Sequence, residues 1–352
     1  MRRLFALFSL IAVIVMVMAA CAAPAAAPAA EAPAAPAEGG DAAAEAPAEP
    51  FRIAIVMPST ITDLAWSQSM YDGLLAVQAE MGGESAMEIA YSENMFNVAD
   101  AAAAIRDYAA EGFDLVIAHG TQYGNSMFEV ATDFPETAFA WGTAVDTGAD
   151  EGHENIFAYE ANAQEGGYVN GVIAALLNQS GVIGVVGPVE AGDAKLYIDG
   201  FVNGVEATNP DIEVNISYTG SFGDTALAAE AANTHIAAGA DILTGSAQQV
   251  VGAIGVAKEA GVPWLGTQSD QSSLAPDLVV ANQVYDWNGV LTDMIAKIQA
   301  GELGGTAYVL TLENGGLKVV FNDGYATTDD VKAAADEAIQ GVIDGSITTL
   351  SE

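Results

Sequence analysis

Aromatic, amide, hydroxyl and acidic side chains recur directly after short apolar runs in this sequence. Asp63, Trp66 and Ser67 follow the first such run. Further candidates follow later runs at Thr121, Gln122, Trp141, Phe222, Asp224, Ser246, Gln268 and Asp270. Aromatic faces stack on planar molecules, and polar groups fix the orientation of what is stacked. This combination predicts a binding site for a flat, polar small molecule.

The residues typical of metal binding or catalysis do not form a recognisable pattern. His119, His153 and His235 lie in separate segments without the spacing of metal ligands. The sequence has no Gly-x-Ser-x-Gly, His-Glu-x-x-His, Walker A or Gly-x-Gly-x-x-Gly motif. A lone histidine at the end of an apolar run, such as His119, is more often structural than catalytic. We therefore expect no metal, no cofactor and no enzymatic activity.

Apolar runs alternate with alanine-rich stretches in the part of the chain that must position these side chains. The runs predict strands at residues 51–57, 114–118, 137–141, 182–186, 213–218, 241–244, 263–266 and 278–282. The stretches predict helices at residues 98–110, 164–177, 225–238 and 248–260, and a last helix near 329–344. This alternation indicates βαβ units, and their number indicates two α/β lobes. Ligands of open α/β sheets lie beyond the carboxyl ends of the strands, where the candidate residues fall.

The first 21 residues have the pattern of a targeting signal. Arg2 and Arg3 precede an apolar run over residues 4–20, and two alanines precede the only cysteine, Cys21. A basic start, a short apolar core and small residues before a cleavage site define a secretory signal. Cys21 resembles the lipidated cysteine of a bacterial lipobox, so we expect residues 1–20 to be removed and Cys21 to carry lipid. The alternative is an ordinary signal peptide or a membrane helix with an incidental cysteine.

Composition separates the next segment from the rest of the chain. Residues 21–50 contain six of the chain's 12 prolines among alanine, glutamate and glycine, which predicts an extended stalk. The 352-residue chain has 9 Lys and Arg against 47 Asp and Glu, for a net charge of −38. Such a charge repels phosphate backbones, so we expect no nucleic-acid partner.

Residues 63–73, with the sequence DLAWSQSMYDG, resemble the first-loop motif of the basic membrane protein (Bmp) family. Members of that family are purine-nucleoside-receptor-like substrate-binding lipoproteins of ABC importers. Agreement continues at residues 111–117, 134–139, 200–204 and 239–243. The resemblance implies a type I periplasmic-binding-protein fold, with two Rossmann-like lobes, three crossovers and a ligand in the cleft. On this basis we assign residues 51–160 plus about 286–325 to an N-terminal lobe. Residues 161–285 plus the C-terminal tail form the other lobe.

The same resemblance assigns roles to the candidate residues. Trp66 matches the aromatic residue that stacks on a purine, and Phe222 matches the one that covers the base from the other lobe. Asp63 matches an acidic position, while Ser67 stands where an asparagine often contacts the base. Each aromatic residue could instead belong to the core.

The sugar side of the implied site departs from the family pattern. Gln268 replaces one acidic residue and leaves Asp270, which could equally cap its own loop. Tyr285 occupies the position of a lysine, and Trp287 belongs to a stretch similar to that of other branches of the family. A purine nucleoside, a free purine base and another flat ligand therefore all remain open.

These patterns together predict a monomeric receptor on the extracytoplasmic face of the cell membrane. It would be held there by its lipid anchor and would deliver a purine nucleoside or base to an ABC permease. A sensory receptor that signals to a membrane kinase or chemoreceptor is the first alternative. Binding of a different small ligand, such as a sugar, is the second.

Overall fold

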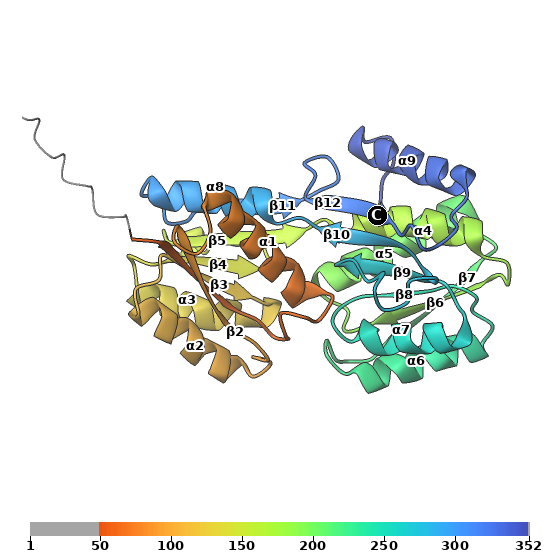
Figure 1. The fold of residues 1–352 in the computed structure, drawn as a ribbon, viewed down its shortest axis with the longest axis horizontal. Helices are drawn as coiled ribbons and strands as arrows, with labels where there is room; N and C mark the ends of the chain where they lie inside the picture. Colours follow the sequence, from red (N-terminus) through yellow and green to blue (C-terminus); the bar gives the residue numbers. More distant parts are fainter. Residues whose placement is uncertain (1–48, 351–352) are drawn as a thin grey trace, which may run out of the picture. The chain divides into compact units, whose positions relative to one another are not determined.

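Near-continuous runs of Val, Ile and Ala form the central strands of two six-stranded sheets, each covered by helices on both faces (Figure 1). This is expected because parallel strands with apolar side chains on both faces need cover on both sides. The structure is a computed structural model that describes residues 49–350. The predicted signal peptide, Cys21 and nearly all of the predicted stalk lie outside the described residues.

The first sheet is entirely parallel and has the strand order β11-β5-β4-β3-β1-β2. Its strands are β1 (Phe51–Val56), β2 (Met87–Ser92), β3 (Leu115–His119), β4 (Ala138–Gly142), β5 (Ile156–Ala161) and β11 (Ala307–Leu310). Its helices are α1 (Trp66–Met81), α2 (Val98–Ala110), α3 (Gly124–Asp133) and α8 (Asn288–Gln299). Helices α1 and α8 pack together, as do α2 and α3, so one pair covers each face. We call this part the first lobe.

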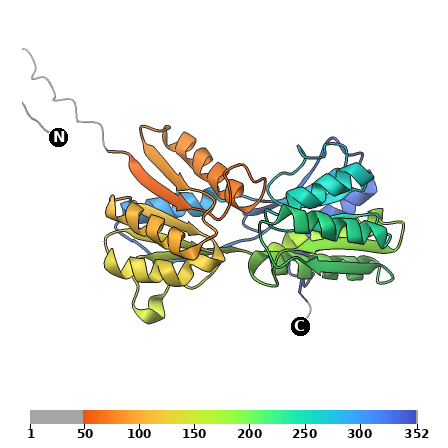
Figure 2. The same ribbon diagram turned by 90° about the horizontal axis from the view of Figure 1, so that it is seen from below.

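The second sheet has the order β12-β10-β9-β8-β6-β7. Its strands are β6 (Val182–Gly187), β7 (Glu213–Tyr218), β8 (Leu243–Gly245), β9 (Trp264–Gln268), β10 (Val279–Tyr285) and β12 (Leu317–Phe321). Its helices are α4 (Ala163–Leu177), α5 (Gly192–Thr208), α6 (Thr225–Ala237), α7 (Val250–Ala260) and α9 (Asp329–Ile343). Helices α6 and α7 cover one face, and α4, α5 and α9 lie on the other (Figure 2). We call this part the second lobe.

The chain passes between the sheets three times. It crosses from β5 through α4 to β6, returns from β10 through α8 to β11, and crosses again from β11 to β12. The predicted fold, with two Rossmann-like lobes and three crossovers, is confirmed. One boundary differs, because β12 pairs antiparallel with β10 although we expected residues up to about 325 in the first lobe. A short edge strand without a motif can join either sheet, and the other lobe boundaries stay predictions.

Glycines set the packing distance between α4 and α5, whose backbones lie close together. A Cβ atom at Gly171 would meet the carbonyl oxygen of Phe201, and one at Gly204 would meet that of Tyr168. Only residues without a side chain let the two backbones approach so closely. This contact fixes the position of α5, whose first turn reaches the candidate site.

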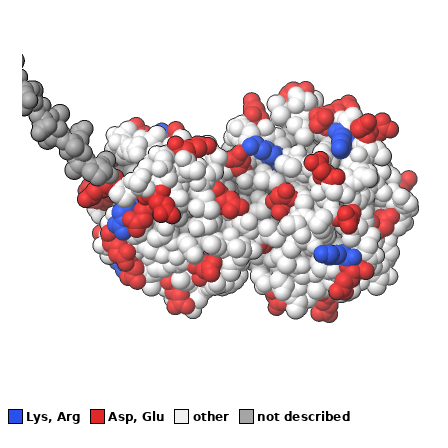
Figure 3. All heavy atoms as spheres, in the orientation of Figure 1, with Lys and Arg blue, Asp and Glu red and all other residues white. Residues whose placement is uncertain are grey.

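Acidic side chains are spread over the surface, with few Lys and Arg among them (Figure 3). The described residues form five ion pairs, of which Arg52–Glu88 and Lys195–Asp199 are examples. All five are at least partly exposed, and such pairs contribute about 0–1 kcal/mol each. The acidic surface is thus mostly solvated.

Candidate functional site

The order of the strands in each sheet indicates where the site lies. In the first lobe the order reverses between β1 and β3, and in the second lobe it reverses between β6 and β8. Loops that leave the carboxyl ends of strands at such a reversal diverge and open a crevice where α/β proteins bind ligands. A cavity that is partly open to solvent lies at these strand ends. It is lined by Pro58, Trp66, Phe96, Gly120, Thr121, Gln122, Thr143, Ala191, Gly192, Asp193, Ala194, Phe222, Ala247, Gln248 and Gln268.

Trp66 forms the first-lobe wall of the cavity and is held rigidly. Its indole stacks on the His119 imidazole, with ring centroids 4.0 Å apart. Trp287 and Tyr285 contact the same indole edge-on, at 5.8 and 6.2 Å. Its Nε1–H donates to the main-chain oxygen of His119 at 3.1 Å. With 6% of its surface exposed, Trp66 is both a core residue and part of the cavity wall.

The hydrogen bonds of His119 define its tautomer. Its Nε2 lies 2.9 Å from the carbonyl oxygen of Trp66, which can only accept, so Nε2 carries the hydrogen. Nδ1 then accepts from the Tyr159 hydroxyl at 2.7 Å. Burial lowers the pKa of His119 to about 3, against the weaker effect of the Trp66 carbonyl. His119 is a neutral structural support, as the sequence predicted.

Asp63 supports the loop that carries Trp66. Its Oδ1 accepts from the amides of Ala65 and Gln68 at 3.0 Å each, and its Oδ2 accepts from the amide of Ser67 at 3.2 Å. Burial raises the pKa of Asp63, and these amides oppose that effect. The carboxylate satisfies the free amides at the start of α1, which is the role of a helix cap.

Residues of the second lobe form the opposite wall. Phe222, from the loop after β7, is half-buried, and Gln248 and Gln268 are 6% and 4% exposed. Ala247 and Gln268 have φ values of 70° and 71°, in the left-handed region that costs non-glycine residues about 1–3 kcal/mol. The surrounding structure holds two residues of this wall in strained conformations, which is common at binding sites.

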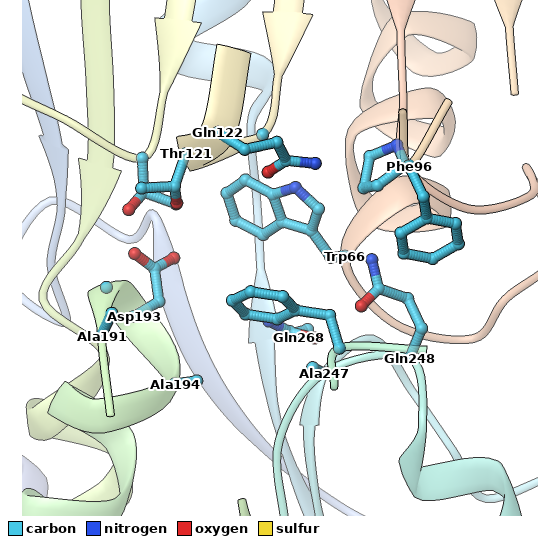
Figure 4. A pocket seen from close by; sticks show the side chains of 15 residues that line it. Trp66, Phe96, Thr121, Gln122, Ala191, Asp193, Ala194, Ala247, Gln248 and Gln268 are labelled. Carbon is cyan, nitrogen blue, oxygen red and sulfur yellow. The ribbon is translucent and has the colours of Figure 1, made fainter. Parts of the chain in front are cut away.

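Asp193, in the first turn of α5, brings a carboxylate into the cavity from the second lobe. Figure 4 shows this carboxylate and the Gln248 amide on opposite sides of Trp66 in the view. Asp193 is 5% exposed. Burial raises its pKa to about 7, while the Thr143 hydroxyl opposes the shift. Neither carboxylate oxygen has a hydrogen-bond partner among the described residues.

Direct contacts join the lobes beside the cavity. The Ser269 hydroxyl donates to the main-chain oxygen of Ala65 at 2.9 Å, and the Gln271 amide donates to that of Leu64 at 3.2 Å. The Phe96 ring lies against Gly223, where an added Cβ atom would be 2.7 Å from the ring. These contacts hold residues of both lobes around the same cavity.

Five of the twelve residues predicted to bind ligand line this cavity: Trp66, Thr121, Gln122, Phe222 and Gln268. Their role as ligand contacts stays a prediction.

The other seven make structural contacts, beginning with Asp63 as described above. Asp224 caps α6 through the amides of Ala226 and Leu227, and Asp270 accepts from the amide of Ser272. The remaining four also lie outside the set of lining residues: Ser67 accepts from Ser59, Trp141 donates to Gly120, Ser246 is 1% exposed, and Trp287 donates to the Ser69 hydroxyl.

Sequence reasoning missed Phe96, Thr143, Asp193 and Gln248. All four follow strands at their carboxyl ends, so position alone does not distinguish them from other loop residues. The strand order is the signal that selects Asp193 and Gln248, because β6 and β8 flank the reversal in the second sheet. The loops that follow residues 182–186 and 241–244 therefore carry cavity-lining side chains that the strand order identifies and the local sequence does not.

Within residues 49–350, no three His, Cys, Asp or Glu side chains are grouped as metal ligands. None of the helices in that range is long and apolar enough to cross a bilayer.

The fold and the cavity between two lobes define a class, the two-lobed α/β binding proteins of the type I periplasmic-binding fold. A solved structure of this class, an ABC transporter solute-binding protein from Conexibacter woesei, superimposes with a TM-score of 0.70 at 24% sequence identity. That match covers 85% of this chain and 98% of the other.

Residues 51–349 match the family model described as Bmp, ABC transporter substrate-binding protein PnrA-like. The chain belongs to this family of extracytoplasmic substrate-binding proteins. It is 28% identical over 310 residues to a protein from Brucella abortus named purine-binding protein, covering 88% of this chain and 85% of that protein. It is 24% identical to a protein from Lactococcus lactis named ABC transporter nucleoside-binding protein BmpA, over 83% and 86% of the two chains.

Proposed function

We propose that this protein is a lipid-anchored receptor that binds a purine nucleoside or purine base between its lobes and delivers it to an ABC permease. The observation that carries this proposal is the pair of aromatic residues, Trp66 and Phe222, which line one cavity from different lobes. Stacking of a base on an aromatic side chain contributes about 1–3 kcal/mol. The relatives named for purine and nucleoside binding support the same ligand class.

Closure of the lobes would couple binding to delivery. A ligand that contacts both Trp66 and Phe222 binds more tightly to the closed state, because only that state presents both rings to it. Ser269 and Gln271 reach across to the first lobe and would stabilise the same state. A permease that recognises surfaces of both lobes would then distinguish the loaded receptor from the empty one.

Titration calorimetry would test the ligand class. The chain from Ala48 onward forms one compact unit. This fragment would be purified, freed of ligand by unfolding and then refolded. Adenine, guanine, hypoxanthine and their nucleosides would be titrated beside glucose and succinate. We expect saturable binding of at least one purine at one site per chain. Clear binding of glucose or succinate with none of any purine would contradict the proposal.

A transport assay would test delivery. Deletion of the gene should abolish uptake of the labelled ligand found by titration, and restoration of the full chain should recover it. Normal uptake in the deletion strain, with loss of a transcriptional or motility response to the ligand, would favour the sensory alternative.

A further inference from the structure

Asp193 is an unusual residue to find in the wall of a receptor cavity. Only 5% of its surface is exposed, and both carboxylate oxygens lack a hydrogen-bond partner among the described residues. It also takes part in none of the ion pairs that those residues form. A buried carboxylate without partners is costly, so such groups are normally paired. A molecule that occupies the cavity can supply the missing partner.

The other unpartnered atoms of the cavity have the same chemical character. They are Gln248 Oε1 and Gln268 Oε1, both buried and both acceptors. A glutamine can rotate its amide and present a donor instead, whereas an ionised carboxylate can only accept. While Asp193 is ionised, it is therefore the lining residue whose demand on the ligand is fixed.

The groups that face Asp193 from neighbouring elements supply no positive charge. The Thr143 hydroxyl follows β4, Tyr159 and Glu160 lie in β5, and Tyr285 ends β10. Glu160 repels a negative charge on Asp193. The Thr143 and Tyr285 hydroxyls lie close enough to favour that charge, although neither completes a hydrogen bond to the carboxylate, and the Tyr285 hydroxyl is itself without a partner among the described residues. The start of α5 adds a modest favourable dipole.

We propose that Asp193 selects the ligand by accepting hydrogen bonds from N–H or O–H groups at one end of the molecule held between Trp66 and Phe222. This inference rests on the proposed function, because it places a purine-type ligand in the cavity. Two sources supply the required donors, namely the N–H groups of a purine base and the hydroxyls of a ribose. While Asp193 is ionised, ligands that present only acceptors or negative charge to this end bind weakly.

The test compares Asp193→Asn with Asp199→Asn in the full-length protein solubilised in detergent. Asp199 lies on the same helix but pairs with Lys195 outside the cavity, so its variant controls for loss of one carboxylate from α5. Titrations would use adenine, adenosine and 2′,3′-dideoxyadenosine. Charge-assisted hydrogen bonds predict that Asp193→Asn weakens binding about 10- to 100-fold, while Asp199→Asn leaves it unchanged.

The three ligands separate the two donor sources. If ribose hydroxyls are the donors, Asp193→Asn weakens adenosine only. If the exocyclic amino group of the base is the donor, it weakens adenine and both nucleosides alike; if the donor is the N9–H group, which nucleosides lack, it weakens adenine only. Equal affinities of wild type and Asp193→Asn for every ligand would overturn the inference and leave the proposed function intact.

The affinity at different pH values gives a readout that a structural role would not change. Below pH 7 the fraction of free protein with an ionised Asp193 falls, so the apparent affinity of wild type should drop about five- to tenfold from pH 7.5 to pH 6. The Asp193→Asn variant should lack this component. If wild type binds no purine, the proposed function fails, and the same comparison with glucose, also rich in hydroxyl donors, tests Asp193 separately. Unchanged glucose binding by the variant would then overturn the inference.

Discussion

The indole of Trp66 lies parallel to the imidazole of His119, with the ring centroids 4.0 Å apart and an interplanar angle of 3°. Because His119 covers one face of the indole, only the other face can serve a ligand. His119 is in turn fixed by the Tyr159 hydroxyl and the Trp66 carbonyl. The binding surface of Trp66 is thus preorganised by the core behind it, which lowers the entropy lost when a ligand binds.

Replacement of Trp66 should lower the stability of the fold, because its indole packs against the core behind the cavity. Trp66→Ala removes a side chain that packs against His119, Tyr285 and Trp287, so we expect a loss of about 3–5 kcal/mol in the free energy of unfolding. Trp66→Phe keeps an aromatic face and loses the Nε1 hydrogen bond, worth about 0.5–1.5 kcal/mol. Urea denaturation measures both. An unchanged stability of Trp66→Ala would show that the ring does not belong to the core.

Phe222 offers a cleaner test of stacking, because it is only half-buried. Phe222→Ala should weaken a purine-type ligand by about 1–3 kcal/mol and lower stability by about 1 kcal/mol. Leu227→Ala is the matched control, since Leu227 is 40% exposed on the adjacent helix and lies outside the cavity. Calorimetric titration of both variants measures their affinities for the purine-type ligand. Equal affinity in the two would exclude Phe222 as the second aromatic face.

The pH dependence of stability should reveal the buried carboxylate in the ligand-free protein. Burial raises the pKa of Asp193 from 3.8 to about 7, so the folded state binds more protons than the unfolded state between these values. Its contribution to stability is present below pH 3.8 and is lost as the pH rises through 7. Asp193→Asn should therefore become progressively more stable than wild type from pH 4 to pH 7, by up to about 4 kcal/mol. Thermal denaturation at several pH values measures the difference, and a constant difference would contradict the assignment.

Two glycines of α7 should respond oppositely to the same substitution. A Cβ atom at Gly255 meets nothing within 4 Å, so Gly255→Ala should stabilise the protein by about 0.5–1 kcal/mol through helix propensity. A Cβ atom at Gly252 would meet the carbonyl oxygen of Thr225 at the start of α6, so Gly252→Ala should destabilise by about 1–3 kcal/mol. Denaturation curves with the same sign for both would contradict the described packing of α6 against α7.

The proposed membrane attachment depends on Cys21, which lies outside the described range. Cys21→Ser should release the protein from the membrane fraction, because the proposed lipid anchor could no longer be attached. Fractionation of cells followed by immunoblotting measures the distribution. Retention of the variant in the membrane would show that the apolar run over residues 4–20 remains as the anchor.

Most of the fold could be predicted from the sequence because buried parallel strands are continuous apolar runs. The eight predicted strands correspond to β1, β3, β4, β6, β7, β8, β9 and β10. The strands that were not predicted are β2, β5, β11 and β12. Three of them lie at sheet edges and expose part of their surface, whereas β5 is almost fully buried and contains Tyr159 and Glu160 within its apolar run. Edge strands carry polar residues on the exposed side, so their apolar signal is weaker.

The site was only partly predictable, for a physical reason. Residues at strand exits either face the ligand or satisfy the free amides of the next helix, and the side chains suited to both tasks are the same. Asp63 and Asp224 serve as caps, whereas Asp193 faces the cavity. Only the strand order and the packing of α5 distinguish these outcomes, and both arise from contacts between distant parts of the chain.

A structure of the protein crystallised with the purine that binds most tightly tests the central claim most directly. We predict planar density between the rings of Trp66 and Phe222, with a donor atom of the ligand within hydrogen-bonding distance of Asp193. Density for the purine outside this cavity, or within it but touching neither ring, would contradict the account.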